Sequence, residues 1–475
     1  MISSRSKYNI AWRRFDFRRL LLIELTRMTI DNNQPALPPS SSGETRLRRI
    51  TSRLAARLRL ATEYTGSRPF PVLSFRETFA AFQYRNYRLW FGGQLVSLIG
   101  TWMQTTAQGF LIYQLTRSPA YLGYVGFAAG LPSWLFMLYG GVIADRVSRR
   151  KLLIVTQTAM MILAAILAAL TFLEVVQPWH ILILALLLGV ANAFDAPARQ
   201  AFVFEMVGRQ DLPNAIALNS TMFNLATVVG PAVAGAAYAA VGPAWCFAFN
   251  GLSFVAVIVA LALMQVQLTP KPVQRAALDD LKDGLQYIRN NIVIRTLIGT
   301  AAMMSLFGLA YTTLIPAWAV TVLGGDAATN GWLQSARGGG ALIGALTVAL
   351  LGRWPVKGKL LTLGGFIFPG LLLIFAEMRW LPLALLTMAG VGWGFMVLFN
   401  MANTLIQTLV PDNLRGRVVS VYTLSFFGLM PLGALLAGWL AELTSEPLTV
   451  VLSALVALAF SAWLWLAVPQ LRALP

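Results

Sequence analysis

The chain has 475 residues, of which 57% are hydrophobic and only 12% are charged. Soluble domains carry about a quarter charged residues, so most of this surface must face lipid instead of water. A single cysteine, Cys246, and a single histidine, His180, exclude a disulfide framework and a Cys/His metal site, and we expect no cofactor. The net charge of +18 is concentrated at one end, because residues 1–88 hold 17 basic and 6 acidic residues, a net +11.

Residues 1–85 are expected to form a basic, partly disordered cytoplasmic extension. Asp31–Thr45 is rich in Pro, Ser and Asn, which is typical of a linker. Apolar residues then recur at helical spacing over 47–61 while arginines share another face, and this predicts a basic amphipathic helix. We favour a surface helix on anionic lipid, with a start codon assigned too far upstream as the alternative. Nucleic acid is not an expected partner, because no aromatic residues alternate with the arginines from Arg46 to Arg59.

From Leu89 onward, apolar stretches of roughly 20 residues alternate with short polar loops, and each stretch is long enough to cross a bilayer. We predict an all-α polytopic membrane protein with 12 transmembrane helices in two pseudo-symmetric six-helix halves. The halves are 86–266 and 295–469, with a central cytoplasmic loop at 267–294 and a cytoplasmic tail at 470–475. The predicted spans are 89–113, 119–144, 152–173, 178–198, 216–240, 245–266, 296–321, 328–351, 360–377, 381–409, 418–442 and 447–469.

The positive charge of the short loops predicts the topology, because cytoplasmic loops retain Lys and Arg. One side has only Arg117 and Arg379. Both termini and the central loop are therefore expected on the other side, in the cytoplasm. The basic residues on that side are Arg146, Arg149, Arg150, Lys151, Arg199, Arg209, Lys271, Arg275, Lys282, Arg289, Arg295, Arg353, Lys357, Lys359, Arg415 and Arg417.

An internal repeat supports the two halves. Ser118–Gly123, at the start of the second span, corresponds to Ala327–Gly331, at the start of the eighth. Parallel repeats of this kind place a substrate site near the membrane midplane, where rocking of the halves exposes it to each side in turn. Further matching pairs are Val207–Ala215 with Val410–Val418, Gly230 with Gly433, and Gly235 with Gly438.

Polar stripes mark the spans that we expect to line this site. Five residues of the first span lie on one helix face, which cannot point at lipid without a partner for each amide. The stripe lines either a substrate cavity, which we favour, or a polar contact with another helix. The expected cavity residues are Gln94, Ser97, Thr101, Gln104 and Gln108 in the first span, Asn192 in the fourth, Gln334 and Arg337 in the eighth, and Asn400, Asn403 and Gln407 in the tenth.

Arg337 is the most unusual residue among the predicted spans. It lies about ten residues into its span, hence about 15 Å deep, where a charge costs roughly 2.5 to 3.5 kcal/mol. Two interpretations have equal weight. Arg337 recognises an anionic or carbonyl-rich substrate, or it is satisfied by carbonyls and amides of neighbouring helices.

The loop after the second span carries a charged motif. Gly140-Gly-Val-Ile-Ala-Asp-Arg-Val-Ser-Arg-Arg-Lys151 resembles the loop signature of the major facilitator superfamily, with Ser148 in place of a usual Gly. Asp195-Ala-Pro-Ala-Arg-Gln-Ala201 and Asn214-Ala-Ile-Ala-Leu-Asn-Ser220 are similar to the branch of enterobactin exporters and transmembrane secretion effectors. The alternative is that the loop's basic residues only determine topology. The resemblance implies a cytoplasmic gate in which Asp145 meets the helix start near Arg417, completed by Arg146, Arg149, Asp195 and Arg199.

The expected function is efflux of a siderophore, drug or other small amphiphile by alternating access, in the cytoplasmic membrane of a bacterium and by a monomer. Protons are the expected coupling partner. Asp195 is the expected proton site, because no acidic residue occurs between Glu77 and Asp145. An ATP-driven mechanism is excluded for this chain alone by the absence of a phosphate-binding Gly-Lys-Ser/Thr loop. A membrane enzyme or a transport-dead sensor is the alternative, but the chain has no paired carboxylates in one span.

Overall fold

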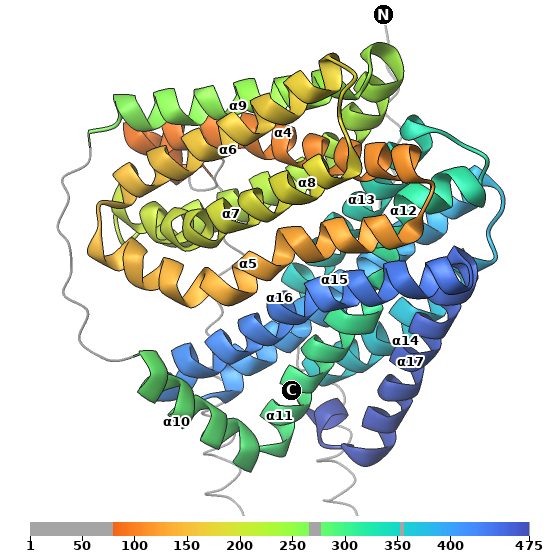
Figure 1. Ribbon diagram of the computed structural model, residues 1–475. Helices are drawn as coiled ribbons and strands as arrows, with labels where there is room; N and C mark the ends of the chain where they lie inside the picture. The colour runs from red at the N-terminus through yellow and green to blue at the C-terminus, as the bar shows by residue number, and fades with distance from the viewer. Residues whose placement is uncertain (1–78, 266–276, 352–355, 475) are drawn as a thin grey trace, which may run out of the picture. The chain divides into compact units, whose positions relative to one another are not determined.

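The protein is described by a computed structural model over residues 79–265, 277–351 and 356–474, in which Phe75–Pro475 form one compact unit. This unit is a bundle of long helices (Figure 1). The amphipathic helix predicted at 47–61 lies outside the described residues. The elements are η1 (Ala80–Gln83), α4 (Arg85–Thr116), α5 (Pro119–Arg146), α6 (Arg149–Phe172), α7 (Pro178–Met206), α8 (Leu212–Val241), α9 (Pro243–Leu263), α10 (Ala277–Asn290), α11 (Ile292–Met303), the π-helix η2 (Met304–Gly308), α12 (Ala310–Thr321), α13 (Ala327–Leu351), α14 (Lys357–Ala376), α15 (Leu381–Leu409), α16 (Asp412–Leu443), α17 (Glu446–Ala467) and η3 (Leu471–Ala473).

Proline and serine residues define several helix starts. Pro119, Pro178 and Pro243 begin α5, α7 and α9, where the fixed backbone angle of proline suits the helix and its missing N–H is not needed. The side-chain oxygens of Ser148 and Ser445 accept hydrogen bonds of 3.3 Å from backbone N–H groups in the first turns of α6 and α17. The short loops therefore end one helix and begin the next within a few residues.

Nine helices among the described residues, counting Ile292–Thr321 as one, are long and apolar enough to span a membrane. α5, which bends between Phe136 and Tyr139, is a tenth if its two parts are counted as one span. α4 and α13, with 32 and 25 residues, are long enough as well, but the polar residues described above lower their hydropathy. The chain is therefore an all-helical, multi-pass membrane protein.

The helices agree with the predicted spans in position and differ mainly at their ends. α15 has the predicted bounds, 381–409, whereas α7 continues to Met206 and α16 already begins at Asp412. These additional turns contain the charged residues Glu205 and Arg415, so hydropathy did not include them in the predicted spans. A helix nevertheless continues beyond the lipid as long as its backbone hydrogen bonds continue. The predicted span 296–321 is interrupted by the π-helix η2, which the apolar pattern does not reveal.

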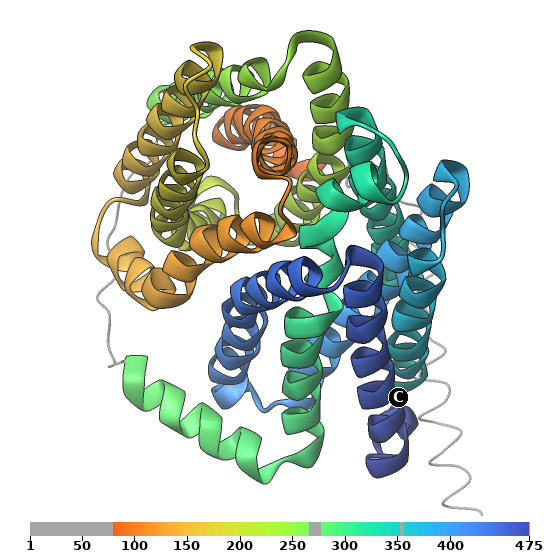
Figure 2. The same ribbon diagram turned by 45° about the vertical axis from the view of Figure 1, so that its right-hand side comes forward.

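Two pairs of helices that are distant in sequence pack closely through small residues. α5 packs on α16, where a Cβ at Gly126 would lie 2.8 Å from the Cβ of Ala434. α8 packs on α13, where a Cβ at Gly331 would lie 2.5 Å from the carbonyl oxygen of Pro231. The missing side chains allow the backbones to approach this closely. Figures 1 and 2 both show α5 running beside α16.

Both contacts lie toward the same end of the bundle. We call the end that holds Arg149, Arg199 and Arg417 the basic end. Gly126 and Gly331 lie near the first turns of α5 and α13, at the opposite end. There the hydroxyl of Ser118 also donates a 2.6 Å hydrogen bond to Glu442, joining α5 to the last turn of α16.

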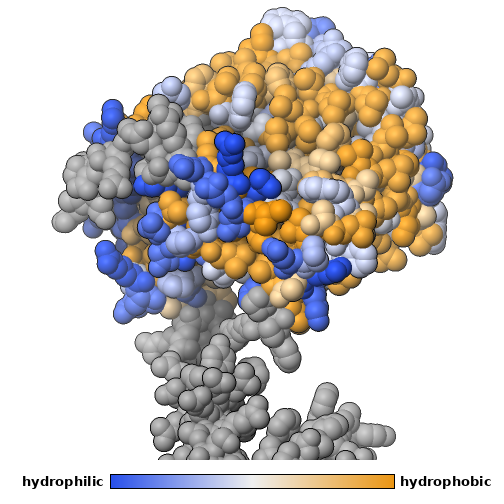
Figure 3. Space-filling model, turned by 90° about the horizontal axis from the view of Figure 1, so that it is seen from below, coloured by the Kyte–Doolittle hydropathy of each residue, from blue (hydrophilic) through white to orange (hydrophobic). Residues whose placement is uncertain are grey.

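The outer surface is largely apolar. Figure 3 shows hydrophobic side chains over most of one face, with hydrophilic side chains gathered toward one side of it. Large apolar residues such as Leu252, Leu386 and Leu466 are at least 65% exposed. Such a surface is unsuited to water and suited to the hydrocarbon core of a bilayer.

Candidate functional site

Asp195 is a buried carboxylate in α7, only 1% exposed. Its Oδ1 accepts hydrogen bonds of 2.9 Å from Thr156 Oγ1 and from Gln157 Nε2, both in α6. Its Oδ2 lies 3.5 Å from Nε of Arg199, one turn further along α7. These partners replace the water that a buried charge loses. Thr156 and Gln157 were not predicted, although adjacent polar residues in an apolar span are a usable signal.

Arg149 joins three helices at the basic end. Its guanidinium lies 2.9 Å from Asp145 in α5 and 2.6 Å from Glu205 in α7. Glu205 was not predicted, and its only signal is that it is an acidic residue within a basic region. Arg146, the neighbour of Asp145, is exposed.

Asp145 and Arg417, which the resemblance would bring together, have other neighbours in this structure. Within the described residues Asp145 is 51% exposed and pairs with Arg149. The start of α16 packs against α10, where a Cβ at Gly284 would lie 3.1 Å from the Cβ of Arg417. The structure therefore does not bring Asp145 and Arg417 into contact.

The polar stripe of α4 is mostly buried within its own group of helices. Gln104 accepts a 2.7 Å hydrogen bond from Asn250 in α9. Of the two interpretations of the stripe, this residue therefore fits a polar contact with another helix. Thr101 donates to the backbone oxygen of Ser97. Gln94 and Gln108 are 1% and 8% exposed, and within the described residues Nε2 of Gln94 has no hydrogen-bond partner.

A polar contact connects α4 to α13. Thr106 Oγ1 lies 3.4 Å from Oε1 of Gln334, whose Nε2 donates to Asn330 at 3.1 Å. Asn330 in turn donates to the backbone oxygen of Thr106 at 3.4 Å. One turn away, Ser335 donates a 2.7 Å bond to the backbone oxygen of Val228 in α8. Thr106 was not predicted, whereas Gln334 was.

Arg337 lies one turn further along α13 than Gln334, toward the basic end, and is half-buried. Its guanidinium interacts with the phenol of Tyr311 in α12, a side chain that is 2% exposed. Within the described part of the chain Arg337 has no carboxylate within 4 Å, and its Nε is buried without a hydrogen-bond partner. An arginine at this depth with unused donors is suited to binding an anion.

A row of aromatic rings extends from Tyr311 through the neighbouring helices. Ring centroids are 6.4 Å apart for Tyr311 and Phe368, 5.6 Å for Phe368 and Phe395, and 5.9 Å for Phe395 and Phe399. Phe399 is 4.6 Å from Phe426. Phe395, Phe399 and Phe426 help to line a small apolar cavity, which we call the aromatic cavity. Tyr311 and these rings were not predicted, because apolar spans are rich in aromatic residues for packing alone.

The remaining predicted cavity residues are less enclosed. Asn192 in α7 and Asn400 in α15 are half-buried. Gln407 is exposed toward the basic end of α15 and donates a 3.2 Å hydrogen bond to Asn403. Within the described ranges no group of three His, Cys, Asp or Glu residues could hold a metal ion.

The sequence of residues 76–474 matches the family described as transmembrane secretion effector. The staphyloferrin A transporter of Staphylococcus aureus is 24% identical over 357 residues, which cover 75% of this chain and 89% of that protein. The multidrug efflux pump Tap of Mycolicibacterium fortuitum is 26% identical and covers 72% and 86%. The enterobactin exporter of Shigella flexneri is 27% identical and covers 81% and 92%.

Solved structures share the fold. A bacterial homologue of the human lysosomal transporter Spinster, in an inward-facing and unoccupied conformation, aligns with a TM-score of 0.60 at 14% identity, covering 84% of this chain and 97% of that one. A POT family transporter in complex with 5-aminolevulinic acid aligns with a TM-score of 0.66 at 10% identity, covering 82% and 97%.

Proposed function

This chain belongs to the transmembrane secretion effector family of the major facilitator superfamily, and on that basis we propose that it exports a small amphiphilic anion by proton-coupled alternating access. The family consists of transporters, so the protein is a transporter and not an enzyme. Relatives named as siderophore and drug exporters support efflux as the direction. The proposed setting is the cytoplasmic membrane of a bacterium, with a monomer and both termini in the cytoplasm.

The observation that carries the choice of substrate is Arg337. A guanidinium in the middle of α13, with a donor that no described residue uses, destabilises the folded protein unless a ligand supplies the missing hydrogen bond and charge. The adjacent Tyr311 adds a phenol, and the aromatic row offers flat apolar surface. An anion that carries an apolar or aromatic body fits both features.

We propose twelve spans in two halves that rock against each other. The nine apolar helices, the bent α5, and the polar α4 and α13 together give this number. The internal repeat supports the division into halves. The matched residues Gly235 and Gly438 make equivalent contacts, since Gly235 lies close to the start of α13 and Gly438 lies close to the start of α5. If the basic end is cytoplasmic, the contacts of Gly126 and Gly331 lie on the outer side, which is the arrangement expected of an inward-facing state.

We propose that the cytoplasmic gate uses the Asp145, Arg149 and Glu205 cluster. When the basic ends of α5 and α16 approach, Asp145 would leave the exposed pair with Arg149 and meet the first turn of α16 near Arg417, which the helix dipole favours. Arg146, Asp195 and Arg199 complete the proposed gate. The inward-facing state then corresponds to an open gate.

Replacing Asp145 with asparagine is expected to slow accumulation of anionic amphiphiles in everted membrane vesicles by roughly three- to tenfold, because the helix dipole loses its charge partner. Vesicles from cells that lack the protein give the background uptake. If wild-type vesicles show no more than this background for cationic, neutral and anionic probes alike, export itself is contradicted. Glu174→Gln is the matched control, since Glu174 is exposed just after α6, at the end of the bundle opposite the proposed gate. A wild-type rate for Asp145→Asn would remove Asp145 from the gate.

Replacing Asp195 with asparagine is expected to abolish accumulation driven by a proton gradient while leaving substrate exchange intact. The amide oxygen can still accept the bonds from Thr156 and Gln157, so the local geometry is preserved, but the side chain can no longer bind a proton. The measurement is uptake into proteoliposomes with and without a pH gradient. Glu377→Gln changes an exposed carboxylate at the end of α14, outside the proposed gate; it is the control and should keep gradient-driven uptake. Gradient-driven uptake at the wild-type level in Asp195→Asn would exclude this residue as the proton site.

A further inference from the structure

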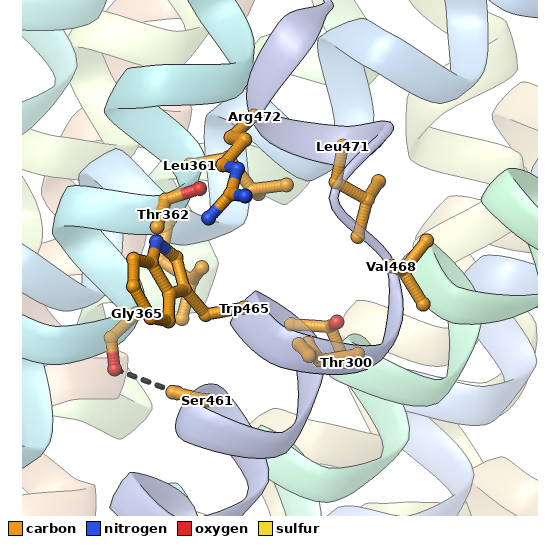
Figure 4. Close-up of a pocket in the computed structure, with 11 residues that line it drawn as sticks. Thr300, Leu361, Thr362, Gly365, Ser461, Trp465, Val468, Leu471 and Arg472 are labelled. Atoms are coloured by element: carbon orange, nitrogen blue, oxygen red, sulfur yellow. Dashed lines mark hydrogen bonds between the residues drawn. The ribbon is translucent and has the colours of Figure 1, made fainter.

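A second pocket opens between α14, α17 and η3, and it shares the lining residues Thr300 and Leu398 with the aromatic cavity. We call it the α14–α17 pocket. Figure 4 shows side chains from these elements arranged around one opening, with the hydroxyl of Ser461 bonded to the backbone oxygen of Gly365 on one side. Its apolar wall is formed by Leu361, Leu398, Leu464, Val468 and Leu471.

Arg472 provides charge at the rim of this pocket. Its guanidinium carbon lies 4.8 Å from the centre of the Trp465 ring, and Figure 4 shows both side chains beside Thr362. Within the described residues no carboxylate lies within 4 Å of Arg472. Stacking on an indole holds the guanidinium in place while leaving its N–H donors available.

The first turn of α14 lies next to Arg472 in the fold. The N–H of Gly358 donates a 3.2 Å hydrogen bond to the backbone oxygen of Leu474, so the first turn of α14 is packed against η3. Lys357 and Lys359 flank Gly358 in the sequence, and Arg472 is the basic residue that lines the pocket. No acidic residue occurs in Lys357–Leu361 or Val468–Leu474.

The α14–α17 pocket lies next to side chains that are typical of the membrane boundary. α17 is the least buried of the nine apolar helices, and Trp465 and Leu466 are 46% and 72% exposed on its surface. An exposed tryptophan next to basic residues is typical of the boundary between hydrocarbon and head groups. The pocket thus offers an apolar interior toward the membrane and a basic rim toward the surface.

We propose that the α14–α17 pocket binds an anionic phospholipid, with the phosphate on Arg472 and an acyl chain against the leucines. The pocket lies outside the α5–α16 and α8–α13 contacts and Arg337 is not among its lining residues, so lipid binding here does not depend on the proposed function. A free phosphate ion would use the rim but leave the apolar interior empty. Only an amphiphile occupies both parts.

The test is lipid titration of the purified full-length protein in detergent, followed by native mass spectrometry, with phosphatidylglycerol, phosphatidylcholine or inorganic phosphate added. Wild type is expected to retain one phosphatidylglycerol in preference to phosphatidylcholine, and phosphate is expected not to displace it. Arg472→Gln should weaken phosphatidylglycerol binding about tenfold, because a charge-assisted hydrogen bond is lost. Lys151→Gln removes one charge at the start of α6 and should bind as wild type.

A second variant fills the pocket without touching its charge. Thr362→Phe should prevent binding of both lipids, whereas Thr387→Phe should not. Thr387 is the matched control because the hydroxyls of both threonines donate hydrogen bonds to backbone oxygens of their own helices. Wild-type phosphatidylglycerol affinity in both Arg472→Gln and Thr362→Phe would overturn the proposal. Displacement of the lipid by phosphate alone would likewise overturn it, in favour of a simple anion site.

Discussion

Replacing Arg337 with glutamine is expected to raise the KM for anionic substrates at least tenfold, while transport of neutral amphiphiles changes little. A hydrogen bond to a charged group contributes about 1.5 to 3 kcal/mol, which corresponds to roughly 10- to 100-fold in affinity. The effect should be large because, among the described residues, Arg337 has no carboxylate within 4 Å and its Nε is buried without a hydrogen bond, so an anion would supply the missing partner. The measurement is initial uptake into everted vesicles over a range of substrate concentrations.

Two further variants separate substrate binding from a structural role. Arg337→Lys keeps the charge and should restore part of the affinity for anions. Tyr311→Phe removes the phenol that Arg337 contacts and should have a smaller effect than the loss of the charge. If Arg337→Gln lowers uptake of anionic and neutral compounds equally, together with thermal stability, Arg337 is only a structural residue of α13. An unchanged KM for anions would lead to the same conclusion.

Hydropathy was sufficient for the course of the chain but not for its details. α15 was predicted at both ends because no charged residue interrupts its whole length. The π-helix at Met304–Gly308 was not predicted, since it changes the hydrogen bonds and not the apolar pattern. α7 and α16 extend beyond their predicted spans because hydropathy registers where lipid ends and not where a helix ends.

The candidate site was predictable where a residue is anomalous by itself. Arg337 is conspicuous in any apolar span, and so is Asp195. Their partners are ordinary residues, and Tyr311 or Thr156 acquires significance only when the fold brings it beside a charge. The polar stripe of α4 shows a second limit of the sequence. The spacing of these residues predicts that they share a helix face, but it does not predict which helix packs against that face. For Gln104 the neighbour is Asn250 of α9.

The proposed alternating access requires the α5–α16 contact to move. In this structure the two helices touch at the end opposite the basic end, where a Cβ at Gly126 would lie 2.8 Å from the Cβ of Ala434. If the halves rock, this contact must separate once in every cycle. The α4–α9 contact, in which a Cβ at Gly93 would lie 3.2 Å from the Cβ of Ala260, lies within one proposed half and should stay closed.

Reversible disulfide cross-linking therefore tests the mechanism most directly. With the buried Cys246 replaced by alanine, Gly126→Cys and Ala434→Cys are introduced together, and Gly93→Cys with Ala260→Cys serves as the matched control. Both Cβ–Cβ distances are below the roughly 3.5 to 4.5 Å of a disulfide, so each helix pair must separate slightly to accommodate the cysteines. The reduced form of each pair is therefore required to transport before it is oxidised. Oxidation of the 126/434 pair is expected to stop efflux and reduction to restore it, whereas oxidation of the 93/260 pair should leave efflux unchanged. Efflux at the wild-type rate from fully cross-linked 126/434 protein would contradict alternating access between these halves.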